Sequence, residues 1–138
     1  MKTIEEVENE IVDEFSIFDD WMDKYEYIIE LGKSVPVIDV SAKTDDNLIK
    51  GCQSRVWLDT RKEDGKLYFS ADSDAIITKG IISLLIRVFN GRSPKEIAEA
   101  DLSFINKIGL MENLTPTRAN GLVSMLERIK TEAKINLK

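Results

Sequence analysis

The stretch that decides the fold is VWLDTRKEDGKLYFS, residues 56–70. Residues 56–61 combine β-forming side chains with partial alternation of apolar and polar positions, and residues 67–70 have the same character. Between them lies Asp64-Gly65, a dipeptide typical of tight two-residue hairpin turns, in which both positions need a positive φ. The sequence therefore predicts one antiparallel hairpin near the middle of the chain.

Helices are predicted upstream of this hairpin. Thr3 followed by Glu6 forms a capping box for a first helix. A second helix is expected to begin at Asp19 or Asp20 and to end at Gly32, a suitable C′ residue. Residues 33–48 contain proline and a polar run, so they are expected to form a loop.

Helices are also predicted downstream. Ser73 or Asp74 is expected to cap a helix over residues 75–89, which is apolar on nearly all sides and therefore central and buried. Gly80 within it costs up to about 1 kcal/mol relative to alanine, so we expect a close packing contact there, against the sheet or the Cys52 loop. Further helices are expected to start at Ser93-Pro94, at Asp101 (ending at Gly109) and at Thr115-Pro116.

The order of these elements predicts an α+β fold. Helices, a small antiparallel sheet and helices again follow one another, without repeats, in a chain of 138 residues. A chain of this length is expected to form a single domain, residues 1–138, with the sheet packed against the helices.

The composition excludes several classes of function. No apolar run approaches the roughly 20 residues that span a bilayer, and the acidic N-terminus resembles neither a signal peptide nor a transit peptide. We therefore expect no membrane partner and a cytoplasmic location. The net charge of −6, spread along the chain, argues against nucleic-acid binding, which needs clustered Lys and Arg.

Cys52 is the only cysteine in a chain without histidine. A Cys–His dyad and an internal disulfide are therefore impossible within the chain, and a zinc or iron–sulfur site would lack ligands. No metal site is expected. A lone thiolate can still attack, carry a group and hand it to another molecule. A single free cysteine also fits a reducing compartment.

The segment around Cys52 leaves a functional thiol and an inert one equally open. Its neighbours Gly51, Gln53 and Ser54 do not form an apolar stripe, and glycine allows close approach of another molecule. Lys50 and Arg55 would lower the pKa of the thiol if they faced it. The alternative is a small buried cysteine without function, a common fate of this residue.

Two polar residues elsewhere have competing interpretations. Asp74 is most simply a helix cap, and its alternative is a polar edge that a partner recognises. Arg118 lies in the first turn of a predicted helix, where the helix dipole disfavours a cation. It either has an external task or pairs with a nearby carboxylate.

Four blocks of sequence, in this order, resemble the SufE family. They are residues 21–32 (WMDKYEYIIELG), 47–58 (NLIKGCQSRVWL), 72–80 (DSDAIITKG) and 114–122 (LTPTRANGL). The resemblance implies the α+β fold that this family shares with IscU-type scaffold proteins. It also implies sulfur transfer in iron–sulfur cluster assembly.

The resemblance implies roles for partners and residues. A SufE-type protein accepts persulfide sulfur from a cysteine desulfurase of the SufS type, stimulates that enzyme and delivers sulfur to a SufBCD scaffold. It is a carrier and activator that needs no cofactor of its own, because the pyridoxal phosphate belongs to the desulfurase. An apolar pocket lined by residues such as Trp57 is expected to shelter the idle sulfur. The site residues implied are Cys52 as carrier, with Gly51, Gln53, Ser54, Asp74 and Arg118 in supporting or partner-contact roles.

Three alternatives compete with this interpretation. A CsdE-like protein would serve a CsdA-type desulfurase and feed another acceptor. A single-cysteine thiol enzyme, such as a peroxidase, would act alone. A structural interaction domain would carry an inert cysteine.

Overall fold

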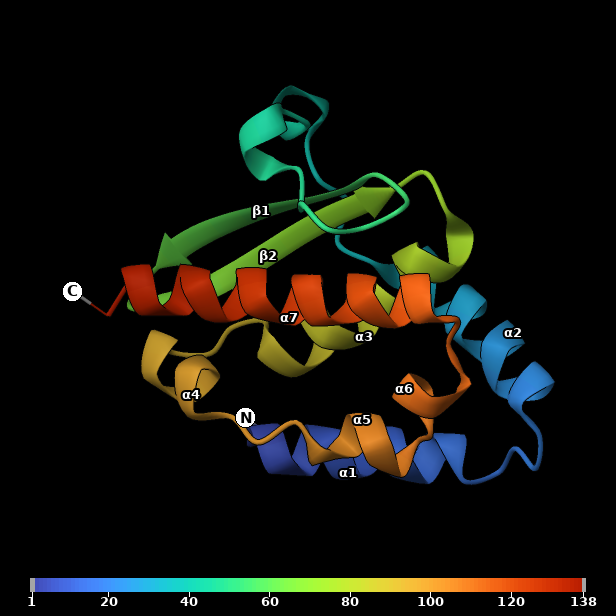
Figure 1. The fold of residues 1–138 in the computed structure, drawn as a ribbon. Helices are drawn as coiled ribbons and strands as arrows, with labels where there is room; N and C mark the ends of the chain where they lie inside the picture. Colours follow the sequence, from blue (N-terminus) through green and yellow to red (C-terminus); the bar gives the residue numbers. More distant parts are fainter. Residues whose placement is uncertain (1, 138) are drawn as a thin grey trace.

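The computed structural model describes residues 2–137. A two-stranded hairpin and the loops around it cover one side of two central helices, α3 and α7, while α1, α4 and α5 lie on the other side (Figure 1). The elements are α1 (Ile4–Phe15), α2 (Trp21–Leu31), β1 (Val56–Glu63), β2 (Lys66–Ser73), α3 (Ile76–Phe89), α4 (Pro94–Glu99), α5 (Ser103–Lys107), α6 (Leu110–Asn113) and α7 (Pro116–Ile135). The predicted α+β fold is confirmed.

The hairpin forms as predicted. Glu63 pairs with Lys66 across the turn, and Asp64 and Gly65 have φ angles of 53° and 77°. Both turn residues thus have the positive φ that a tight hairpin turn with the twist of the strands requires. The strands extend a few residues beyond the predicted segments, and alternate side chains on one face are buried: Val56, Leu58, Leu67, Phe69 and Ala71.

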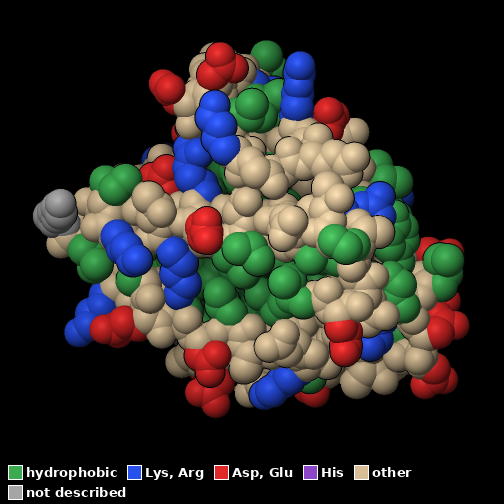
Figure 2. Space-filling view, viewed as in Figure 1, with side chains coloured by type: hydrophobic (Ala, Val, Ile, Leu, Met, Phe, Trp, Pro, Cys, Tyr) green, Lys and Arg blue, Asp and Glu red, His purple; other side chains and the backbone are tan. Residues whose placement is uncertain are grey.

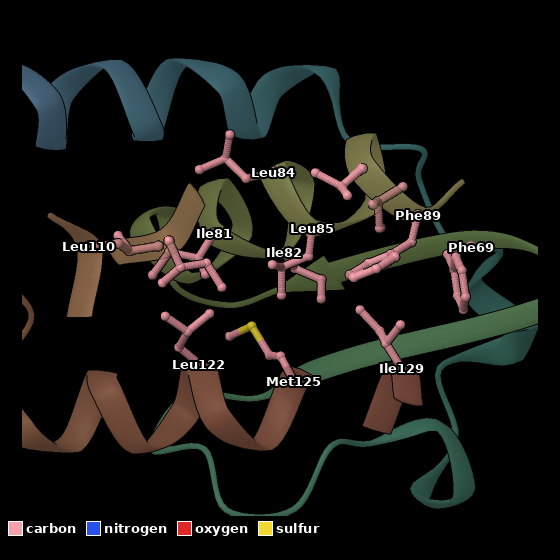
Figure 3. Close-up of a cluster of buried hydrophobic side chains, with 14 of the residues drawn as sticks. Phe69, Ile81, Ile82, Leu84, Leu85, Phe89, Leu110, Leu122, Met125 and Ile129 are labelled. Atoms are coloured by element: carbon pink, nitrogen blue, oxygen red, sulfur yellow. The ribbon is translucent and has the colours of Figure 1, made fainter. Parts of the chain in front are cut away.

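The predicted central helix is the centre of the core. Fourteen residues long, α3 is buried over most of its surface, including Ile82 and Leu85, which are fully buried. Figure 3 shows α3 side chains meeting Leu122, Met125 and Ile129 of α7 on one side and Phe69 of β2 nearby. The few polar side chains of α3 lie along one stripe, Lys79, Ser83 and Arg87, and each has a polar partner on a neighbouring segment.

The close packing of Gly80 is confirmed, but its expected partner was wrong. A Cβ at Gly80 would overlap the backbone carbonyl of Ile28, and a Cβ at Gly32 would lie 2.9 Å from the backbone N of Gly80. The two glycines therefore bring α2 and α3 together, rather than α3 and the sheet. Gly32 has φ −60°, so it is not the left-handed C′ residue that we expected.

Most predicted helix starts are confirmed. Thr3 and Ser93 form capping boxes, Asp20 caps α2 and Thr115 caps α7. The helix expected from Asp101 to Gly109 is shorter: α5 ends at Lys107, and Gly109, with φ 75°, separates it from α6.

The cap predicted for α3 was wrong. Ala75 is the N-cap, without a side-chain hydrogen bond, and Ser73 and Asp74 make other contacts, described below. The expected loop over 33–48 contains short 3-10 turns at Gly32–Ser34, Val40–Ala42 and Asp45–Asn47. Val37 forms a parallel bridge to Ala71, which anchors this segment to β2.

The face of the molecule drawn in Figure 2 carries both hydrophobic and charged side chains. Figure 2 shows a hydrophobic area between α7 and the α4–α6 segment, with charged side chains around it. Within residues 2–137, no helix is long and apolar enough to cross a membrane.

Candidate functional site at the Cys52 loop

The Cys52 loop, residues 50–55, is closed at its base by the sheet. The backbone N–H of Ile49 donates to the carbonyl of Val56 over 2.8 Å, and Leu48 bridges to Trp57. Ile49 and Val56 are both buried. The loop is therefore held at a rigid edge of the core, a common arrangement for reactive side chains.

Asp74 fastens the end of this loop to the start of α3. Its carboxylate accepts from the backbone N–H of Arg55 over 3.0 Å, and its own N–H donates to the Arg55 carbonyl over 3.2 Å. The hydroxyl of Ser73 also donates to that carbonyl over 2.8 Å. The two residues expected to cap α3 thus fix the backbone three residues after Cys52.

Gly51 is required by the path of the loop. Its φ is 90°, in the region that side-chain-bearing residues rarely adopt. A Cβ at this position would also overlap the hydroxyl of Ser124 on α7. The loop backbone therefore lies directly on α7, and a side chain at position 51 would be strained by the positive φ and would need the Ser124 hydroxyl to move.

The thiol of Cys52 contacts Gly121 of α7. Sγ donates to the carbonyl of Gly121 over 3.5 Å, and a Cβ at Gly121 would lie 3.5 Å from Sγ. Cys52 is half-buried, and this burial raises the pKa of the thiol. The expectation that Lys50 and Arg55 would lower that pKa was wrong: both are exposed, and burial is the cause of the shift.

A cavity of about 50 Å³ adjoins the thiol. Its apolar lining comes from Ile81 of α3 and Met125 of α7, whereas Trp57 is not part of it. The expected Trp57 contact was wrong because Trp57 lies on β1, where Lys43 sits 5.2 Å from the centre of its ring. The cavity is lined by Cys52, Gln53, Ser54, Thr78, Ile81, Thr117, Arg118, Gly121 and Met125.

Arg118 lines this cavity from the first turn of α7. Its guanidinium lies 5.9 Å from the centre of the Tyr25 ring, at cation–π distance. Within residues 2–137 it forms no ion pair, so the expected carboxylate partner is absent. This charge faces the site without being neutralised by another part of the described chain.

The structure brings most of the predicted site residues together. Gln53, Ser54 and Arg118 share the cavity with Cys52, while Asp74 acts at a distance through the Arg55 backbone. The Cys52 loop packs on Gly121 and Ser124 of α7, and neither was predicted as a site residue. The signal for Gly121 was present, since a glycine near the start of a helix is unfavourable unless something packs against it.

Chemically, the arrangement offers one nucleophile, the Cys52 thiol. Within residues 2–137, no three Asp, Glu, Cys or His side chains are grouped to hold a metal ion. The site therefore presents a half-buried thiol that contacts Gly121 of α7.

Comparison with known proteins identifies the family. The model of the SufE family, described as an Fe-S metabolism associated domain, matches residues 9–133. An uncharacterised SufE-like protein of Rhizobium meliloti (strain 1021) is 43% identical over 131 residues, which is 91% of this chain and 94% of that one. A SufE-like protein of Synechocystis (strain PCC 6803) is 37% identical over 123 residues, 89% of this chain and 77% of that one.

The fold also matches a solved structure. The solution structure of a hypothetical protein from Thermus thermophilus superimposes with a TM-score of 0.77 at 22% identity, covering 95% of this chain and 96% of that one. The chain belongs to the SufE family, and its role is sulfur transfer in iron–sulfur metabolism.

Proposed function

We propose that Cys52 is the sulfur carrier of this SufE-family protein. It takes persulfide sulfur from a cysteine desulfurase of the SufS type and passes it to a SufBCD-type scaffold. The observation that carries this proposal is a half-buried thiol beside a cavity of about 50 Å³. A water molecule needs roughly 10–15 Å³ of such space, so one additional sulfur atom fits beside Sγ.

The proposed step is a transfer between two thiols. The Cys52 thiolate attacks the outer sulfur of the donor's persulfide, a new S–S bond forms at Cys52, and the donor's S–S bond breaks. The donor leaves as a thiolate, so no external oxidant or reductant is consumed. A single cysteine suits a carrier, because a second thiol would resolve the persulfide into a disulfide and release the sulfur.

The contact between Cys52 and Gly121 of α7 would let such a carrier protect its bound sulfur. In the retracted loop, the carbonyl of Gly121 holds Sγ and burial disfavours the thiolate. Attack on the donor therefore requires Cys52 to move away from Gly121. Its return would bury the persulfide sulfur again. Removal of persulfide from the donor would also stimulate the desulfurase.

We assign the supporting residues by their contacts. Gly51 lets the loop lie on α7, Asp74 holds its end, and Gln53, Ser54 and Arg118 form the accessible rim that a partner meets. The chain itself supplies no cofactor, since the pyridoxal phosphate of the desulfurase carries out the bond cleavage. A free thiol of this kind belongs in a reducing compartment, and the cytoplasm is the location that we propose.

Replacing the thiol tests the proposal. Cys52→Ser should keep the fold and the thermal midpoint but lose both sulfur uptake and stimulation of a SufS-type desulfurase. Wild-type protein alkylated at Cys52 should behave in the same way, which controls for any effect of the substitution itself. Sulfur uptake by Cys52→Ser would show that the carrier is assigned to the wrong residue.

The choice of partner needs a separate measurement. A CsdE-like protein would bind a CsdA-type desulfurase more tightly than a SufS-type one, and dissociation constants for both enzymes decide between them. The chain has no histidine to act as a base, which disfavours a self-contained thiol peroxidase. Peroxide consumption by the isolated protein would support that alternative.

A further inference from the structure

Thr78 of α3 is a buried polar residue in the wall of the Cys52 cavity. It is 7% exposed, and it lines the cavity of about 50 Å³ together with Cys52. Among residues 2–137, its hydroxyl takes part in no hydrogen bond, not even one to a carbonyl of the preceding turn, which threonine in a helix often makes.

This hydroxyl reaches the surface of the cavity. The fully enclosed side-chain atoms without a partner in residues 2–137 belong to Thr60 and Arg92, so the oxygen of Thr78 is not sealed within the core. A hydroxyl that lies in a nearly buried residue and has no partner is unfavourable. It therefore points to a group that enters the cavity and accepts its hydrogen bond.

The contact between Sγ and Gly121 suits only the empty thiol. The thiol donates its hydrogen to the Gly121 carbonyl over 3.5 Å. In a persulfide, Sγ is bonded to carbon and to the outer sulfur, so it has no hydrogen to donate. The outer sulfur also ionises more readily than a thiol. A loaded Cys52 therefore loses its bond to Gly121 and presents an anionic sulfur atom that needs donors.

The rest of the cavity lining offers such donors. Apart from Cys52, Arg118 is the only residue of the lining that can carry a charge, and it forms no ion pair within residues 2–137. The Asp74 carboxylate and the exposed Lys50 and Arg55 are not part of the lining. Thr78 from α3 and Arg118 from α7 thus meet the cavity from two helices.

The remaining lining suits a large, weakly hydrated atom. Ile81 and Met125 are buried, and Figure 3 shows both in the cluster between α3 and α7. Apolar side chains of this kind keep water away from the cavity and strengthen the electrostatic interactions within it. A sulfur anion fits such a mixed lining better than a small hydrated ion does.

We propose that the hydroxyl of Thr78 binds the outer sulfur of the Cys52 persulfide as an anion, with the guanidinium of Arg118 supplying the opposite charge. This inference rests on the proposed carrier function and adds how the loaded protein holds its sulfur. The Gly121 carbonyl favours the protonated empty thiol, whereas Thr78 and Arg118 favour the ionised persulfide. Repulsion between like charges would also slow attack on the outer sulfur by a thiolate reductant.

The test loads Cys52 without a desulfurase, so that it is independent of the donor. Full-length protein is first converted to a mixed disulfide between Cys52 and an aryl thiol. Hydrosulfide then attacks Sγ, a new S–S bond forms, and the aryl thiolate leaves, so Cys52 carries the persulfide. Intact mass verifies the product, and the near-ultraviolet absorption of the persulfide anion is followed as pH changes.

Three variants test the hydroxyl of Thr78. Thr78→Val removes it and should raise the midpoint of persulfide ionisation by about one pH unit, a tenfold change in the equilibrium. Thr78→Ser keeps it and should restore the wild-type midpoint. Thr60→Val, the matched control, removes a buried hydroxyl outside the cavity and should leave the midpoint unchanged. Arg118→Gln, which removes the charge, should also raise the midpoint.

The empty thiol provides the comparison that a general effect on the loop would not pass. Its own ionisation, followed by alkylation, should change little in Thr78→Val, because Sγ bonds Gly121. An equal shift in empty and loaded protein would overturn the proposal, as would a persulfide midpoint that neither Thr78→Val nor Arg118→Gln changes. Wild-type protein that shows the expected shifts but takes no sulfur from an active desulfurase would support this binding site and refute the carrier function.

Discussion

At the scale of single residues, the Cys52 thiol is half-buried against α7. Burial against Gly121 raises its pKa and so favours the protonated, less nucleophilic form. Asp74 adds a hydrogen bond to the Arg55 backbone, which stabilises the retracted loop. The same residues therefore determine how often the thiol becomes accessible.

Loss of the Asp74 carboxylate should release the loop. The Asp74 carboxylate is exposed, so its hydrogen bond should contribute about 0.5–1.5 kcal/mol, and Asp74→Ala should increase the open population about two- to tenfold. Alkylation of Cys52 in the native protein should accelerate accordingly, as followed by intact mass. Asp19→Ala, an exposed residue far from the loop, is the control. Equal alkylation rates in both variants would contradict the role given to Asp74.

The raised pKa of Cys52 predicts a pH dependence. Alkylation follows the thiolate, and burial shifts thiolate formation to higher pH. The rate in the native protein should therefore continue to rise at pH values where the rate for the unfolded chain has levelled off. Asp74→Ala should move the midpoint downward. A native midpoint below that of the unfolded chain would contradict burial as the cause.

At the scale of elements, contact between α2 and α3 depends on Gly80. An added methyl group would meet the Ile28 backbone, which cannot move aside without shifting α2. Gly80→Ala should therefore destabilise the fold by about 1–3 kcal/mol, despite the better helix propensity of alanine. Urea unfolding measures this.

Gly121→Ala is the matched control for Gly80→Ala. It introduces the same methyl group into another helix, but at an ordinary van der Waals distance of 3.5 Å from Cys52 Sγ. It should keep or slightly raise the free energy of unfolding because alanine favours helix. Equal loss of stability in both variants would contradict the packing argument.

An ion pair joins α1 to α3. Arg87 donates two hydrogen bonds to the Glu14 carboxylate, at 2.9 and 2.5 Å, and Tyr27 donates a third at 2.6 Å. Hydrogen bonding by Arg87 lowers the pKa of Glu14 below 4.5, and burial raises that of Tyr27 to about 12. Because the folded-state pKa of Glu14 is depressed, its contribution is present above pH 4.5 and is lost as pH falls through the folded value.

Removing this pair should cost about 1–2 kcal/mol at neutral pH. Arg87→Ala should show that loss in urea unfolding, and the difference from wild type should shrink as pH falls below 4.5. Arg61→Ala is the control, since its pair with Glu63 is more than half exposed and should contribute little. A difference that grows in acid would contradict the assigned sign.

The sequence predicted elements better than it predicted their contacts. Thr3, Ser93 and Thr115 are local signals, so their helix starts could be read directly. The partner of Gly80 could not, because Ile28 reaches it only through the packing of α2 on α3. For the same reason, Asp74 looked like a helix cap, although its carboxylate bonds Arg55, nineteen residues earlier.

At the scale of the whole molecule, the candidate site is assembled from three distant segments. The motif around Cys52 and the block containing Arg118 could be recognised in the sequence through family resemblance. The contact of Sγ with Gly121, 69 residues later, and the absence of Trp57 from the cavity depend on how α7 crosses the loop. That crossing is set by the packing of the whole core, and no local pattern encodes it.

The same assembly separates two surfaces. The thiol loop lies beside the hairpin, and an acidic groove lies along α1, α4 and α5 (Figure 1). Five of the acidic side chains behind the net charge of −6 line this groove, on the side away from the thiol.

The most direct test of the central claim is the intact mass of the protein after incubation with a cysteine desulfurase and free cysteine, without reductant. We expect the mass of one or more added sulfur atoms, located by peptide mapping at Cys52 and absent when the desulfurase is omitted. An active SufS-type and an active CsdA-type desulfurase that both leave the mass unchanged would contradict it.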